Sequence, residues 1–170
     1  NIKNNYSNNE IINIVWEGLG SNVYQLNILK DVLNEFSKSH EFKLNVITDL
    51  YFNKHLNSFG RTSTEKILSN LCEDICIKKW HKDTYAKLIT ECDIAIIPID
   101  NTSKLALGKP ENKLILFWKM GMPTLTSSTV SYSRVMKDSK IHLGCNNDNE
   151  WLKNLNNLAS NQELRKNIAI

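Results

Sequence analysis

From residue 11 to the end, the chain alternates short apolar runs with stretches whose apolar residues recur at helical spacing among polar ones. Six short runs rich in Ile, Leu and Val predict β-strands at 11–16, 43–48, 75–80, 94–99, 123–127 and 140–144. Between them apolar residues recur at spacings of three and four, which predicts helices over 23–36, 62–72, 82–92, 111–120, 129–137, 151–158 and 162–170. This alternation predicts an α/β fold, a Rossmann-like three-layer αβα sandwich with a mostly parallel sheet of about six strands.

Two local signals sharpen this prediction. The run Ile94 to Ile99 is almost entirely β-branched, which is typical of a strand that is buried on both faces. Thr62 and Glu65 have the spacing of a capping box, so we expect them at the start of a helix.

The first ten residues differ from the rest of the chain. Residues 1–10 are rich in Asn and carry few large apolar groups, so they predict a linker, and residues 11–170 predict one domain. Because the sequence opens on a linker without a leading Met, we expect it to be the downstream part of a longer protein.

Composition excludes several classes of protein. The 170 residues carry a net charge of only +3, which is far from the basic stripe of nucleic-acid binders, so no nucleic-acid partner is expected. The four cysteines lack zinc-ligand spacing, which predicts reduced, mostly buried thiols and no metal. The longest apolar run is too short to span a bilayer. The expected location is the cytoplasm, with peripheral contact at the inner face of the membrane left open.

Ligands of open parallel sheets bind beyond the carboxyl ends of the strands. The loops at that edge are expected at 17–22, 48–61, 80–83, 100–112 and 127–130. In the first of them, "GLGSN" places Gly18, Gly20 and Ser21 directly after a strand, where backbone amides could hold an anion. The loop lacks a third glycine and the Lys of a P-loop, so a plain tight turn is an alternative.

A second candidate is "GKPENKL" at 108–114. It places Glu111, Asn112 and Lys113 in the first turn of a helix, just after Lys109. A Lys is unfavourable beside the positive end of a helix dipole, and a bound phosphate would explain it. A solvated first turn is the alternative.

Trp80 and His81 close the third predicted strand at the same edge. An aromatic ring there could flank a nucleobase, although core packing with a polar tip is equally consistent. The sequence shows no nucleophile elbow and no His-Glu-x-x-His, so no catalytic residue is assigned.

The stretch "CDIAIIPI" followed by "PENKLILFWKMGMPTLTS" resembles the donor-binding C-terminal domain of group-1 retaining glycosyltransferases, which have the two-domain GT-B fold. One branch of that family has the motif Asn-Lys-Leu-x-Glu-(Tyr/Phe)-x-Ala-x-Gly-x-Pro. The positions that match are Asn112, Lys113, Leu114, Phe117, Gly121 and Pro123. The resemblance covers nearly all of 11–170, including the closing Trp-Leu and Gln-Glu-Leu-Arg helices.

The resemblance implies a glycosyltransferase half that binds a nucleoside-diphosphate sugar and needs no other cofactor. Transfer of a hexose-type sugar to a glycan or glycolipid, in polysaccharide or glycoconjugate synthesis, would require an acceptor-binding domain upstream. By position, Lys109 and Glu111 to Lys113 face the donor diphosphate, the loop Gly18 to Ser21 closes over it, and Trp80 and His81 lie near the base.

Two departures from the family pattern favour other functions. The motif's Glu aligns with Leu116, which cannot accept a hydroxyl proton, and residues 14–29 lack the family's basic pair. Lys109, Lys113 or Arg61 are the candidates to supply that charge. A catalytically degenerate nucleotide-sugar-binding or interaction module is the alternative, and half of a nucleotide-sugar epimerase is a third.

Overall fold

The structure is a computed structural model that describes residues 1–7, 9–53, 60–102 and 108–169. One parallel six-stranded sheet lies at its centre, and its strand order is β5-β2-β1-β6-β7-β8. The strands are β1 (Ile12–Glu17), β2 (Phe42–Thr48), β5 (Ile75–Lys79), β6 (Ile94–Ile97), β7 (Thr124–Ser127) and β8 (Gly144–Cys145). The order follows the doubly wound pattern in which the chain starts in the middle, fills one side and then fills the other.

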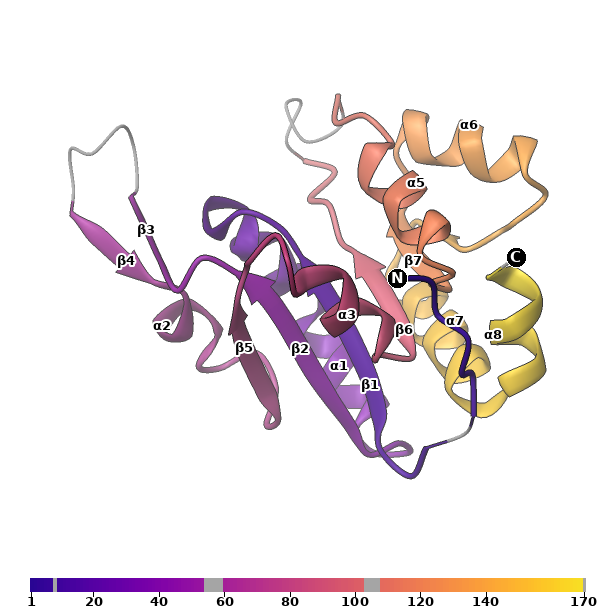
Figure 1. Ribbon diagram of the computed structural model, residues 1–170, viewed down its shortest axis with the longest axis horizontal. Coiled ribbons are helices and arrows are strands. Elements are labelled where there is room, and N and C mark those ends of the chain that lie inside the picture. The colour runs from indigo at the N-terminus through magenta and orange to yellow at the C-terminus, as the bar shows by residue number, and fades with distance from the viewer. Residues whose placement is uncertain (8, 54–59, 103–107, 170) are drawn as a thin grey trace.

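Helices cover both faces of the sheet, which confirms the three-layer prediction (Figure 1). The element after β1 is a 3-10 helix, η1 (Gly20–Leu29), that continues as α1 (Lys30–Phe36). The other helices are α2 (Thr64–Leu68), α3 (Tyr85–Thr90), α5 (Asn112–Lys119), α6 (Val130–Asp138), α7 (Asp148–Ser160) and α8 (Gln162–Ile168). α1 packs against α7 behind the sheet in Figure 1, while α3 lies in front of it.

The apolar runs become the core because parallel strands are covered on both sides. All four residues of β6 are buried, as the unbroken run predicts. β1 pairs in register with both β2 and β6, so it lies at the centre of the sheet.

Three features differ from the sequence-based expectations. A small antiparallel ribbon of β3 (Tyr51–Asn53) and β4 (Arg61–Ser63), which the apolar pattern did not predict, extends beyond the sheet (Figure 1). The cap of α2 is Ser63 because the helix begins at Thr64, and the Ser63 side chain accepts the N–H of Lys66, whereas the expected cap Thr62 lies one residue earlier. The last strand is two residues long and begins at Gly144, where the predicted strand at 140–144 ends.

The segment predicted as an Asn-rich linker contacts the domain. Lys3 is 6 % exposed, its N–H bonds to the Met120 carbonyl at 2.8 Å, and its ammonium donates to the Cys92 carbonyl at 2.6 Å. The Tyr6 hydroxyl donates to the Gly121 carbonyl at 2.9 Å. The described residues of this segment are therefore anchored at the end of α5 and beside β6.

Candidate functional site

A cavity of about 360 Å³ opens where the carboxyl ends of β1 and β6 meet. This is the switch point of the sheet, because the chain fills one side from β1 and the other side from β6. Diverging loops at such a point leave a crevice that ligands of doubly wound folds occupy. The cavity is lined by Trp16, Glu17, Gly18, Asn22, Gln25, Ile97, Pro98, Ile99, Lys109, Pro110, Asn112, Lys113, Leu116 and Tyr132.

Two lysines bring positive charge to this cavity. The Lys113 ammonium donates to the backbone carbonyl of Glu17 at 2.6 Å and to the carboxylate of the same residue at 2.5 Å. The Lys109 ammonium donates to the side-chain oxygen of Asn22 at 3.3 Å. Burial lowers the pKa of Lys109, and the nearby charge of Lys113 lowers it further. The two ammonium groups therefore both bring positive charge to this cavity.

The helix α5 begins beside these lysines. Asn112 is its first residue and lines the cavity, and Glu111 precedes it without capping the helix through its side chain. The N–H groups of a first helical turn have no partner within the helix and carry the positive end of its dipole. An anion in the cavity would meet both these amides and the lysines.

Glu111 is turned toward α6 instead. Its carboxylate accepts a hydrogen bond from the Arg134 guanidinium at 2.6 Å, and it is not among the residues that line the cavity. Its own backbone N–H and then Arg134 lower the pKa of this carboxyl group. Glu111 thus links the start of α5 to α6.

The glycines after β1 have different surroundings. Gly18 lines the cavity, and a Cβ there would lie 2.8 Å from the Trp16 ring. The N–H of Gly20 donates to the Asp49 carboxylate at 3.1 Å, and a Cβ on Gly20 would lie 2.6 Å from the Phe52 ring. Gly20 therefore allows close packing against Phe52 of β3, and Ser21 is exposed and does not line the cavity.

Trp80 and His81 lie at the edge of the sheet, two strands away from β1. The Trp80 ring stacks on Tyr85 with ring centroids 5.4 Å apart. The His81 ring nitrogen Nδ1 accepts the N–H of Asp83 at 3.3 Å. Neither residue lines the cavity at the switch point, so the structure does not bring this predicted pair together with Lys109 and Lys113.

Several lining residues were absent from the sequence-based candidates. Tyr132 of α6 is 2 % exposed, and burial raises the pKa of its hydroxyl to about 12, with Glu111 adding to the rise. Gln25 lines the cavity and accepts the N–H of Asp100 at 2.5 Å. No sequence motif marks either residue, because their proximity to the site depends on how η1 and α6 pack.

Two departures noted in the sequence can now be placed. Leu116 does line the cavity, so an apolar side chain faces the site at the position where the family that this chain resembles has Glu. Lys109 and Lys113 supply positive charge there, whereas Arg61 lies over the Tyr51 ring of the β3–β4 ribbon, 6.0 Å from its centroid. Among the described residues, no group of three or more His, Cys, Asp or Glu side chains could hold a metal ion.

The same described residues include no helix long and apolar enough to cross a membrane. The sequence matches no protein-family model and no curated protein.

Solved structures share the fold. A structure from Listeria monocytogenes described as a UDP-N-acetylglucosamine 2-epimerase has a TM-score of 0.56 and 14% identity, over 96% of this chain and 40% of its own. The E. coli trehalose-6-phosphate structure bound with UDP-2-fluoro glucose has a TM-score of 0.54 and 10% identity, over 94% and 39%. The lipopolysaccharide outer core galactosyltransferase WaaB has a TM-score of 0.52 and 11% identity, over 99% and 46%.

These neighbours have GT-B-type folds, and this chain spans 39% to 46% of their length. The chain therefore has the Rossmann-like α/β fold of one half of a GT-B protein.

Proposed function

We propose that this chain is the donor-binding half of a glycosyltransferase and that its cavity at the switch point holds the diphosphate of a nucleotide sugar. The observation that carries the proposal is the convergence of Lys109, Lys113 and the first turn of α5 on one cavity. Ammonium groups and free helix amides are donors suited to phosphate oxygens. The fold of the neighbours, which include a galactosyltransferase and a structure bound with UDP-2-fluoro glucose, supports the same class of ligand.

The chemistry asked of these residues is electrostatic. Negative charge grows on the leaving diphosphate as the bond between sugar and nucleotide breaks, and fixed donors that are already in place stabilise that charge. Lys113 and the first-turn amides of α5 would serve this role without moving a proton. A second domain would bring the acceptor, in keeping with a chain that spans less than half of its structural neighbours.

The apolar wall of the cavity limits where the sugar and ribose hydroxyls can lie. Leu116, Ile97 and Pro110 offer no hydrogen-bond acceptor in their side chains. The hydroxyls of the donor therefore need partners outside this wall, and we place only the diphosphate in the cavity.

Calorimetry with nucleoside diphosphates and their sugars tests the proposal. Lys113→Ala should weaken binding about tenfold or more, because a charge-assisted hydrogen bond contributes about 1.5–3 kcal/mol. Lys119→Ala is the matched control, since it removes the same charge from the exposed end of the same helix. Equal affinity of the two variants would remove Lys113 from the site.

A catalytically degenerate nucleotide-sugar-binding module is the second candidate, and Leu116 favours it. The two differ in turnover when an acceptor-binding domain is present. Transfer of a sugar by the longer protein supports the enzyme, whereas binding of the donor without transfer supports the degenerate module.

A further inference from the structure

The strand β5 forms one edge of the sheet, and its outer side is open. Among the described residues it pairs with β2 alone. The Asp74 carbonyl accepts the N–H of Leu44 at 2.9 Å, and the N–H of Trp80 donates to the Thr48 carbonyl at 3.0 Å. The backbone N–H and C=O groups of the even-numbered residues of β5 therefore face β2. The N–H and C=O groups of Ile75, Ile77 and Lys79 therefore point away from the sheet, as on any edge strand that can accept another.

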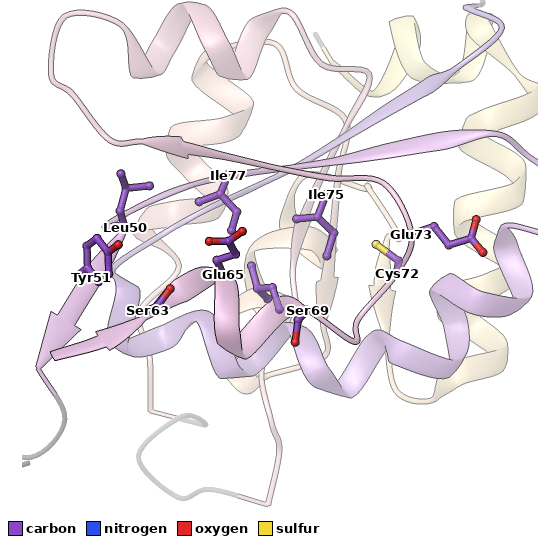
Figure 2. Close-up of a pocket in the computed structure, with 10 residues that line it drawn as sticks. Leu50, Tyr51, Ser63, Glu65, Ser69, Cys72, Glu73, Ile75 and Ile77 are labelled. Carbon is purple, nitrogen blue, oxygen red and sulfur yellow. The ribbon is translucent and has the colours of Figure 1, made fainter. Parts of the chain in front are cut away.

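A groove of about 440 Å³ runs beside this edge (Figure 2). The crossover helix α2 has only five residues and leaves Ile75 and Ile77 half-buried. Nearby Leu50 is 41 % exposed and Tyr51 is 58 % exposed. The edge strand thus lies next to apolar surface, which favours contact with a partner.

The charges along the edge are arranged in two blocks. Glu73 and Asp74 precede the strand, and Lys78 and Lys79 end it. Within the described residues, Glu73, Lys78 and Lys79 have no ion pair, and Asp74 pairs with Lys43 at 3.4 Å through half-exposed side chains. Lysines on an edge usually discourage pairing with another strand, but acidic groups at the opposite end make this edge complementary to itself when reversed.

We propose that two copies of this chain associate through this edge, by antiparallel pairing of β5 with β5 of the second copy, centred on Cys76. In that register Ile75 lies opposite Ile77 of the second copy. The two-fold axis makes this Ile75–Ile77 pair occur twice, and each pair exchanges two backbone hydrogen bonds through N–H and C=O groups that already point outward. The two-fold axis uses the same patch on both copies, as an isologous interface requires.

The same register pairs the charges. Lys79 lies opposite Glu73 of the second copy, and Lys78 lies opposite Asp74, so each dimer has four such oppositely charged pairs. A parallel arrangement would place the lysines beside one another and repel. The charge pattern therefore selects the antiparallel arrangement and this register.

This surface is separate from the candidate donor site. The strand β2 lies between β5 and β1, and no residue of β5 lines the cavity at the switch point. The inference does not depend on the proposed function.

Sedimentation equilibrium of the chain over a range of concentrations tests the proposal. We expect a reversible dimer that Lys79→Glu weakens about tenfold, because two favourable charge pairs become two unfavourable ones. Glu73→Lys combined with Lys79→Glu should restore the dimer. Lys153→Glu makes the same charge change on α7 and should leave the dissociation constant unchanged.

A short thiol–thiol cross-linker provides a second readout. Residues opposite each other in a non-hydrogen-bonded antiparallel pair have Cα atoms about 4.5 Å apart, so the two Cys76 thiols should be joined. Cys76→Ser should abolish the covalent dimer, and Cys72→Ser should retain it. A monomer at every concentration, equal weakening by Lys79→Glu and Lys153→Glu, or cross-linking that survives Cys76→Ser would each overturn the proposal.

Discussion

At the scale of single residues, Glu17 sets the charge that the candidate site offers to an anion. Lys109 and Lys113 contribute two positive charges, and the Glu17 carboxylate neutralises one of them through its ion pair with Lys113. The Glu17 side chain is only 13 % exposed, so water screens this pair less than it screens surface pairs. An incoming diphosphate must compete with this carboxylate for the Lys113 ammonium.

Glu17→Gln should therefore strengthen the binding of a nucleoside diphosphate. We expect about a fivefold gain in affinity, since the repulsion between two like charges is removed while the hydrogen-bonding shape is kept. Calorimetry with UDP and ADP measures it. Glu41→Gln removes a carboxylate before β2 and serves as the control. Weaker binding by Glu17→Gln would mean that Glu17 itself contacts the ligand.

The sequence pointed to some of the residues that line this cavity and not to others. Lys109, Asn112 and Lys113 were predictable because a Lys is unfavourable beside the positive end of a helix dipole, and a bound anion would explain its presence there. Gln25 and Tyr132 were not, because nothing in their local sequence distinguishes them from other helical residues. Their place in the lining comes from packing between distant parts of the chain.

At the scale of elements, the helix starts show what short motifs can and cannot predict. The capping box expected at Thr62 is wrong by one residue, since the helix begins at Thr64 and Ser63 is its cap, while both Thr62 and Ser63 pair within a ribbon that the pattern did not reveal. Before α7, Asn147 accepts the N–H of Glu150 at 3.0 Å, and Glu150 accepts the N–H of Asn146 at 2.8 Å. The hydrogen bonds from Asn146 lower the pKa of the Glu150 carboxyl group.

Asn147→Ala should destabilise the protein by about 1 kcal/mol, because the first turn of α7 loses the acceptor for one of its free N–H groups. Asn157→Ala, at an exposed position within the same helix, should be neutral or slightly stabilising. Urea denaturation of the two variants measures the difference. Equal stability would show that the cap contributes nothing to α7.

The element after β1 shows the other limit of sequence patterns. Apolar spacing over 23–36 predicts one helix, and the structure has a 3-10 helix that passes into an α-helix at Lys30. Both helix types place residues three or four apart on one face, so periodicity alone does not distinguish them.

At the scale of the whole molecule, Arg165 joins the two ends of the chain. Its guanidinium is fully buried and donates to the carbonyls of Leu158 and Ala159 in α7 and to those of Tyr6 and Ser7 in the N-terminal segment. A single side chain thus holds α7, α8 and the first residues together.

Arg165→Met should lower the free energy of unfolding by about 3 kcal/mol, because buried carbonyls lose charged donors. Lys166→Met changes an exposed neighbour on α8 and should have little effect. Thermal denaturation compares the two, and limited proteolysis should show faster cleavage near Tyr6 in Arg165→Met. A variant as stable as the parent would contradict the role assigned to Arg165.

Buried thiols make the stability of the whole molecule sensitive to alkali. Burial raises the pKa of Cys92 from 9.0 to about 12, and burial likewise raises the pKa of Cys145 to about 11. A group whose pKa is higher in the folded state contributes stability below its unfolded pKa and loses that contribution as the pH rises toward the folded value. The free energy of unfolding should therefore fall between about pH 9 and pH 11.

Cys92→Ala should flatten this fall. The thiol accounts for about 2 kcal/mol of the loss between pH 9 and pH 11, because a proton held by the folded state alone makes stability fall by about 1.4 kcal/mol for each pH unit. Urea denaturation of both proteins at several pH values gives the slopes, and the stability at pH 8 corrects for the lost sulfur atom. Identical slopes would show that the Cys92 thiol ionises equally in both states.

The sequence by itself determined the kind of fold, because short apolar runs that alternate with apolar spacings of three and four are satisfied by strands and helices that share one core. It also determined that Lys109 and Lys113 stand beside the start of a helix, since that depends on neighbours along the chain. Only the tertiary structure decided that Lys113 pairs with Glu17, that Lys109 bonds to Asn22, and that Trp80 and His81 lie two strands away. Such contacts depend on strand order, which places residues far apart in the sequence at the same edge of the sheet.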